Sequence, residues 1–293
     1  MTSLLTAEEL REIRRLHVQA GRRVDALLSG DYRSAVRGRG MEFEEVRSYQ
    51  PGDDIRHLDW NVTARTGEPF VKIFREERQL TLLLVVDVSG STRVGTGGRD
   101  GRTDRRLQLA RVAGGLAFAS YRNRDQVGLV TFSDRVEEVL TPRRTRGHVW
   151  AVIRTVYDPR AHGQGTNLAE ALRLVARTQK RRAVVVIASD FLDPGPWDRV
   201  LGALSRKHAV YGVCLTDPLD DGLTGLGLVS VVDAETGRRR LVDARQLRGS
   251  VPVADRLQRL RRAGAHAFEL STQDDPFAVL HTELHAAAGR RRR

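Results

Sequence analysis

The chain has 293 residues, of which 40% are hydrophobic and 29% are charged, and its formal net charge at pH 7 is +12. This composition excludes wholesale disorder, and the length suits one large domain or one domain with a smaller appendage. Charge is balanced over residues 1–80, so the basic excess falls on the rest of the chain and on the four arginines that end it. Aromatic residues make up only 5%, whereas a nucleic-acid surface places aromatic side chains between its arginines. We therefore expect weak attraction to polyanions and no specific nucleic-acid recognition.

The sequence has a single cysteine, Cys214, which lies in an apolar run. One cysteine forms neither an internal disulfide nor a thiolate metal cage, so we expect a buried, hydrophobic role. The first residues lack the basic and apolar regions of a signal peptide, and the longest apolar runs are far shorter than the ~20 residues of a membrane helix. These features predict a cytoplasmic protein without a transmembrane segment.

The first predicted domain covers residues 1–78. Apolar residues at helical spacing predict an amphipathic helix over 7–28. Short alternating segments at 41–47 and 70–74 indicate strands. Between them, Pro51-Gly52-Asp53-Asp54 predicts a turn followed by a helix start at the acidic pair. The sequence therefore predicts a small α+β subdomain.

The second predicted domain covers residues 79–289 and is followed by a basic tail at 290–293. Its first strand, 80–86, is a nearly continuous apolar run, as in strands that are covered on both faces. Further strands are predicted at 126–132, 135–140 (antiparallel), 183–189, 209–215 and 266–270, with a hairpin over 228–242. Helices are predicted at 104–121, 148–156, 167–178, 197–207, 253–263 and 276–287. This alternation predicts an α/β fold: a doubly wound, mainly parallel sheet with helices on both faces.

Oxygen-bearing side chains follow three of the predicted strands or open the next helix. Asp87, Ser89 and Ser91 come directly after the first strand, and alternation places them on one side of the chain. Thr166 precedes a helix, and Asp190 follows the strand at 183–189. Ligands of doubly wound sheets bind beyond the carboxyl ends of the strands, and carboxylate and hydroxyl oxygens are hard donors. The sequence therefore predicts a divalent cation site, for Mg²⁺ or for Mn²⁺ or Ca²⁺.

A helix-start signal adjoins the fourth of these oxygens. Asn167 is a predicted N-cap, and Glu170 stands three residues later, which is the spacing of a capping box. We therefore expect Thr166 at the N-terminal end of a helix.

Asp87-Val-Ser89-Gly-Ser91, then Thr166 and Asp190, resembles the metal-ion-dependent adhesion site (MIDAS) of von Willebrand factor A-like domains. The resemblance implies that Ser89, Ser91 and Thr166 bind the metal directly, and that Asp87 and Asp190 act through water or behind the ligands. It also implies an interaction in which a carboxylate of a partner protein completes the metal's coordination.

The segment from Gly38 to Arg65 and the later Glu76-Glu77-Arg78 resemble the signature of domain-of-unknown-function family 58. The resemblance covers residues 10–285 and implies association with MoxR-type AAA+ ATPases in the assembly or maturation of other proteins. The family pattern usually has Met after the last serine of the metal motif, where this chain has Thr92. The loop over 95–102 is also longer than in the family, and both departures fall on the rim that a partner would touch.

The motif within residues 47–65 has two interpretations. It can be structural, with arginine–carboxylate pairs and a packed Trp60 that fixes the subdomain on the sheet. It can also be a docking surface, for which the candidate partner-binding residues are Thr92, Arg56, Asp59, Trp60 and Arg65.

Other chemistries fit the sequence less well. A Mg²⁺-dependent phosphohydrolase would use Asp87 as nucleophile, but Ser89 stands where such enzymes have their general acid. The serines do not lie in a Gly-x-Ser-x-Gly elbow, and the glycine-rich loop has no Gly-Lys-Ser/Thr. His281 and His285 have one-turn spacing without the Glu position of a zincin, which favours a solvated helix face. We therefore expect a non-enzymatic, metal-dependent interaction module; the alternatives are the phosphohydrolase and a weak polyanion-binding protein.

Overall fold

The computed structural model describes residues 41–76, 80–93, 105–158, 163, 165–221, 227–232, 239–243 and 251–290, together with residue 11. The chain divides into a small unit, Arg37–Leu80, and a larger unit that contains Thr81–Arg293. The predicted helix over 7–28, the loop over 95–102 and the tail from 291 onward lie outside the described residues, and the predicted domain boundaries remain a prediction.

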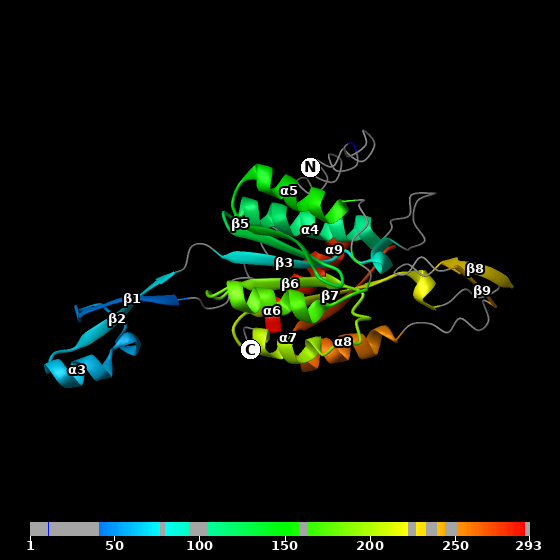
Figure 1. The fold of residues 1–293 in the computed structure, drawn as a ribbon. Coiled ribbons are helices and arrows are strands. Elements are labelled where there is room, and N and C mark those ends of the chain that lie inside the picture. The colour runs from blue at the N-terminus through cyan, green and yellow to red at the C-terminus, as the bar shows by residue number, and fades with distance from the viewer. Residues whose placement is uncertain are drawn as a thin grey trace. The chain divides into compact units, whose positions relative to one another are not determined.

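The larger unit is built on a six-stranded sheet (Figure 1). From one edge to the other, its strands are β10 (His266–Ser271), β7 (Ala209–Thr216), β6 (Val184–Ser189), β3 (Thr81–Asp87), β4 (Gln126–Phe132) and β5 (Val136–Arg143). All neighbours are parallel except β5, which runs antiparallel to β4. The predicted antiparallel edge strand is therefore confirmed.

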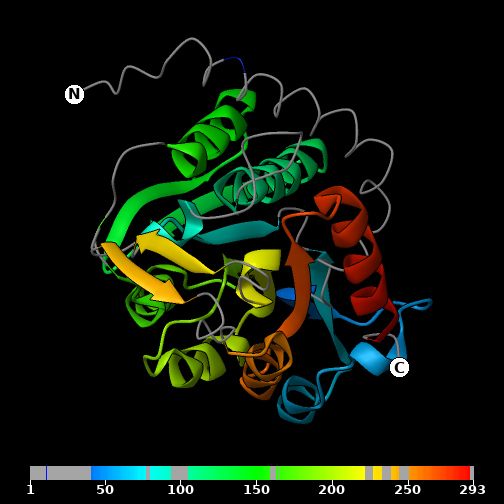
Figure 2. The same ribbon diagram turned by 90° about the vertical axis from the view of Figure 1, so that its right-hand side faces the viewer.

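Helices cover both faces of this sheet (Figures 1 and 2). One layer contains α4 (Arg105–Arg122), α5 (Arg146–Tyr157) and α9 (Pro276–Arg290). The other contains α6 (Leu168–Thr178), α7 (Trp197–Ser205) and α8 (Val253–Arg262). Together with the strand order, these layers confirm the predicted doubly wound, mainly parallel α/β fold.

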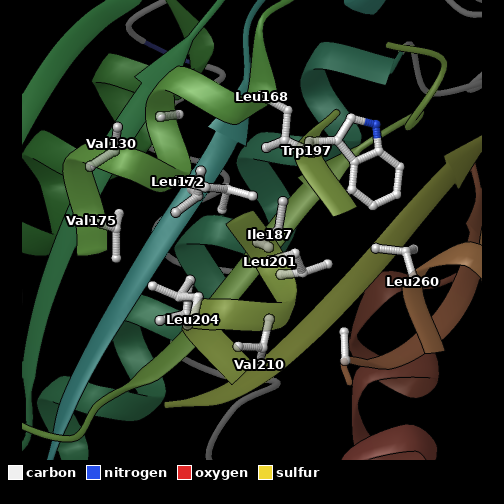
Figure 3. Packing of buried hydrophobic residues seen from close by; sticks show 14 of the residues in the cluster. Val130, Leu168, Leu172, Val175, Ile187, Trp197, Leu201, Leu204, Val210 and Leu260 are labelled. Carbon is white, nitrogen blue, oxygen red and sulfur yellow. The ribbon is translucent and has the colours of Figure 1, made fainter. Parts of the chain in front are cut away.

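The burial of the central strands explains why their sequences are unbroken apolar runs. Residues 82–86 of β3 and 184–188 of β6 are buried on both faces, because a helical layer lies over each face. Figure 3 shows the cluster on the α6–α7–α8 side, which includes Leu172, Trp197 and Leu260 of the helices and Ile187 of β6. Cys214 lies in the same cluster and is buried, as predicted, and burial raises the pKa of its thiol to about 12.

The small unit contains two antiparallel strands, β1 (Met41–Ser48) and β2 (Phe70–Glu76), a short 3-10 helix η1 (Ile55–His57) and the helix α3 (Trp60–Thr66). Asp54 caps η1 by accepting a hydrogen bond from the Arg56 amide, so the helix start predicted at the acidic pair is confirmed. Asp59 caps α3 in the same way. This unit is α+β, as expected.

Two further elements follow β7. The 3-10 helix η3 (Pro218–Asp221) comes first, and then β8 (Leu228–Val232) and β9 (Arg239–Asp243) pair as the predicted antiparallel hairpin. In Figure 1 this ribbon lies beyond the end of the sheet at which β3 finishes.

Candidate metal centre

The first two ligand segments meet because β3 and β6 are parallel neighbours. Val86 pairs with Ala188, so β3 ends at Asp87 beside the end of β6 at Ser189. Asp87 is 0% exposed and Asp190, the next residue after β6, is 4% exposed. The structure thus brings two carboxylates from distant parts of the sequence to one buried edge.

A chain of hydrogen bonds connects these residues. The Ser89 amide donates to Asp87 Oδ1 at 2.9 Å, and the Ser189 hydroxyl donates to Asp87 Oδ2 at 2.6 Å. Ser89 Oγ lies 3.1 Å from Ser91 Oγ, and the Ser91 hydroxyl donates to Asp190 Oδ2 at 3.0 Å. Three of the predicted ligand oxygens therefore lie in sequence, with Asp87 fixed behind them.

These separations fit a small divalent cation. Oxygens held at about 2.1 Å in an octahedron lie about 3.0 Å from their nearest neighbours. The two successive spacings, 3.1 Å and 3.0 Å, match that edge length. Within the described part of the chain, no three His, Cys, Asp or Glu side chains cluster as a metal site. A cation at this edge would therefore depend on hydroxyl oxygens as well as carboxylates.

Thr166 comes to the same edge by a different route. The amide of Val88 donates to the carbonyl of Phe132 at 2.8 Å, and the amide of Asn167 donates to the carbonyl of Ser133 at 2.7 Å. Phe132, the last residue of β4, thus holds the first ligand segment. Ser133, the residue after it, holds Asn167, which follows Thr166. Thr166 itself is half-buried. The structure places it at the correct edge but gives it no hydrogen bond to Ser89 or Ser91.

The helix start next to Thr166 is half of the predicted capping box. The Asn167 side chain accepts a hydrogen bond from the Glu170 amide at 3.2 Å and so caps α6. The Asn167 amide, which the Glu170 side chain would satisfy in a full box, instead donates to Ser133. This exchange ties the cap to the sheet.

Asp87 has an altered proton affinity. Its complete burial, and secondly the nearby Asp190 carboxylate, raise its pKa to about 6 against the opposing effect of the hydrogen bonds from Ser189 and Ser89. A bound cation would reverse this penalty because it favours the ionised carboxylate. The site thus holds a buried acid that is costly to ionise without a counter-charge.

Sequence reasoning missed the arginines around the site. Three of them are buried: Arg105 and Arg106 are each 6% exposed, and Arg256 is 4% exposed. Arg105 pairs with Asp220 of η3 and donates to the Ser91 carbonyl at 3.4 Å. A signal was present, because two arginines open α4, where the helix dipole disfavours cations.

The segment after β6 is held from the other helical layer. Arg256 of α8 donates to the Asp190 carbonyl at 2.7 Å, and the Leu192 amide donates to Asp190 Oδ1 at 3.1 Å. Phe191, the residue after Asp190, has φ of 54°, which is in the left-handed region that costs a non-glycine residue about 1–3 kcal/mol. Backbone strain at this point accompanies the turn that presents Asp190.

The structure separates the candidate partner-binding residues. Thr92 is 1% exposed and bonded within the site, so it is not available to a partner. Asp59 is 8% exposed, caps α3 and lies 3.4 Å from Lys72 Nζ, which is a structural role. Arg56 and Arg65 are exposed, and Trp60 is 71% exposed. Trp60, the first residue of α3, is therefore not packed within the small unit, and its packing on the sheet remains a prediction.

The expected arginine–carboxylate pairs are present in this unit. Arg47 forms a two-pronged bond with Asp53 at 2.7 and 2.8 Å, and Arg56 contacts Asp54 at 2.9 Å. These pairs join residues six and two positions apart, so they order the turn before η1.

The geometry does not suit a phosphohydrolase in which Asp87 is the nucleophile. Both Asp87 oxygens accept hydrogen bonds and the residue is 0% exposed, so it is not presented to a phosphoester.

His281 lies on α9, as predicted.

Relatives of similar length exist among curated proteins. The uncharacterized proteins Mb1516 of Mycobacterium bovis and Rv1480 of Mycobacterium tuberculosis are each 32% identical over 289 residues, covering 96% of this chain and 89% of the relative.

Solved structures resemble the fold at low identity. An aerotolerance-related membrane protein from Bacteroides fragilis matches with a TM-score of 0.51 and 14% identity, over 72% of this chain and 99% of that one. The SpRpn10 VWA domain matches with a TM-score of 0.41 and 11% identity, over 69% of this chain and 93% of that one.

Across the described part of this chain, we find no helix with the length and apolar character to span a membrane. A family model described as "Protein of unknown function DUF58" matches residues 45–261. With three quarters of its length inside that match and full-length relatives at 32% identity, the chain belongs to the DUF58 family.

Proposed function

We propose that this protein is a non-enzymatic, metal-dependent protein-interaction module. The observation that carries the proposal is the pair of hydroxyl oxygens Ser89 Oγ and Ser91 Oγ, whose 3.1 Å spacing suits the edge of a Mg²⁺ octahedron, with Asp190 Oδ2 bonded to Ser91 behind them. Thr166 would supply a further ligand, and Asp87 would act behind Ser89. Mn²⁺ or Ca²⁺ are alternative occupants of the same donor set.

The environment of the site supports binding rather than hydrolysis. Asp87 is enclosed, and its two oxygens accept hydrogen bonds from the Ser89 amide and the Ser189 hydroxyl. Few anionic ligands would leave a bound cation able to attract one more carboxylate. The half-buried Ser91 marks the open side from which a partner's Asp or Glu would reach it.

We propose a MoxR-type AAA+ ATPase as the partner, from the family resemblance, and the cytoplasm as the location, from the shortness of the apolar runs in the sequence. The exposed Trp60, Arg56 and Arg65 of the small unit are candidates for a second contact with this partner. Trp and Arg are the residues most enriched among strongly contributing interface positions.

The test measures the equilibrium affinity of the purified chain for a purified MoxR-type ATPase, in Mg²⁺ and in EDTA. We expect EDTA and Asp87→Asn each to weaken binding at least tenfold, while Asp255→Ala, a change of an exposed aspartate on α8, leaves it unchanged. Binding that is equally tight under all four conditions contradicts the proposal, as does the absence of binding in Mg²⁺.

A further inference from the structure

The guanidinium of Arg106 lies directly behind the first ligand segment. Nη2 donates to the Val88 carbonyl at 2.6 Å, and Nη1 donates to the Asp158 carbonyl at 3.1 Å. Arg106 belongs to the first turn of α4 and is 6% exposed. One side chain therefore joins the segment after β3 to the end of α5.

Thr92 completes this arrangement. Its hydroxyl donates to the Ser89 carbonyl at 2.8 Å and accepts hydrogen bonds from Arg106 Nε at 3.0 Å and Nη2 at 2.8 Å. The Thr92 amide also bonds to the Ser89 carbonyl, at 3.2 Å. Arg106 and Thr92 thus fix the main chain on both sides of Ser89 and Ser91.

The contact with Asp158 reaches a second element. Asp158 is the C-cap of α5. The guanidinium therefore bonds at one end to the first ligand segment and at the other to the end of α5.

We propose that Arg106, acting with Thr92, is a positioning residue that holds the Ser89–Ser91 turn in the geometry that binds the metal. This inference rests on the proposed function. A planar guanidinium with several fixed donors can bond two carbonyls and one hydroxyl at once, whereas an ammonium group is a compact donor without that fork. The bonds to the Val88 and Asp158 carbonyls and to the Thr92 hydroxyl fix the main chain of the turn.

A role in general fold stability would have different consequences. If Arg106 only fills and stabilises the interior, its loss lowers global stability and leaves the turn as protected as the rest of the fold. If it positions the turn, the turn loosens while the rest of the larger unit does not.

The experiment compares Arg106→Lys, Thr92→Val and the double variant with the wild type. Arg122→Lys, at the exposed far end of the same helix, is the matched control. Three quantities are measured: hydrogen exchange of the Ser89 and Thr92 amides without metal, Mg²⁺ affinity by calorimetry, and the urea midpoint. Thr92→Val is nearly isosteric, so it tests the inference even if Arg106→Lys folds poorly.

We expect both single variants to speed exchange of these two amides about tenfold or more relative to amides of β7. We also expect each to weaken Mg²⁺ binding by ~10–100-fold, the range for residues that orient metal ligands. The double variant should lose less than the product of the two effects, because both variants break the same bonds.

Exchange that rises equally in the turn and in β7, or Mg²⁺ affinity that stays within twofold of wild type, overturns the positioning role. A wild-type chain that binds no Mg²⁺ overturns the proposed function instead. In that case the exchange data alone decide whether Arg106 orders the turn, and unchanged exchange refutes it.

Discussion

Asp87 is a carboxylate on which burial and a neighbouring like charge act together. It is fully enclosed, it faces Asp190, and it accepts hydrogen bonds from Ser89 and Ser189. These bonds offset part of the cost of burying a carboxylate, and the raised pKa measures what remains.

The raised pKa predicts how stability changes with pH in the metal-free protein. The pKa of Asp87 is about 6 in the folded chain, against about 4 for an unfolded aspartate. Between these values the folded state keeps a proton that the unfolded state has lost, so the free energy of unfolding falls as pH rises from 4 to 6. The loss is at most ~3 kcal/mol at 1.36 kcal/mol per pKa unit.

Urea unfolding of wild type and Asp87→Asn in EDTA, from pH 4 to 8, measures this effect by difference. The wild type should lose stability relative to the variant over the window and recover it when Mg²⁺ is added at pH 7. A constant difference between the two proteins across the window would show that Asp87 does not titrate as described.

The sequence predicted the site residues that follow from local order, but not those whose roles depend on distant contacts. Strand alternation and the strand ends pointed to Asp87, Ser89, Ser91 and Asp190 because each follows directly from local order. Ser189, Arg106 and Arg256 were not found, since their roles depend on contacts with residues 102, 18 and 66 positions away.

At the scale of elements, two helix caps make a matched pair. Asn167 caps α6 next to Thr166, and Thr145 caps α5 through the His148 amide. Replacing either by Ala should lower the free energy of unfolding by ~1 kcal/mol, the usual value of such a cap. Only Asn167→Ala should also weaken Mg²⁺ binding, because only this cap adjoins a predicted ligand.

Thermal or urea unfolding and Mg²⁺ calorimetry on both variants check this expectation. Equal Mg²⁺ affinity in the two variants would remove Thr166 and its helix start from the proposed site.

Gly163 lies in the segment that leads to Thr166 and leaves no space for a side chain. A Cβ there would lie 1.7 Å from Asp134 Oδ1 and 2.8 Å from Ser133 Oγ. Its amide also donates to Glu137 Oε1 at 2.9 Å. Gly163→Ala should therefore displace the segment and cost about 1–3 kcal/mol, as overpacking does.

Gly147 on α5 is the control, since nothing lies within 4 Å of a Cβ there and Ala favours a helix by ~0.5–1 kcal/mol. Unfolding midpoints measure both changes. A Gly163→Ala protein as stable as Gly147→Ala would mean that the contacts of Gly163 are not those described.

Most elements were predictable because apolar periodicity is local. The central strands matched within a residue or two, since both their faces are covered and the apolar run ends where the sheet ends. The edge strand β5 extends to Arg143, beyond the predicted end, because its solvent-facing residues weaken the pattern.

At the scale of the whole molecule, the net charge of +12 sets a weak background attraction to nucleic acids. Such binding releases counterions, so it should fall steeply with salt and show no sequence preference. Fluorescence anisotropy with two unrelated DNA duplexes should give weak, similar affinities at ~50 mM salt and none at ~200 mM. Binding that survives at the higher salt and distinguishes the duplexes would favour the polyanion-binding alternative.

The central claim is that hydroxyl and carboxylate oxygens at the carboxyl edge of the sheet bind one divalent cation. Titration calorimetry with Mg²⁺ tests it most directly, on the wild type, on Ser91→Ala and on Ser230→Ala, which changes an exposed serine of β8. The account predicts one Mg²⁺ per chain for the wild type and for Ser230→Ala, and at least tenfold weaker binding for Ser91→Ala. No binding to the wild type, or equal binding to all three proteins, would contradict it.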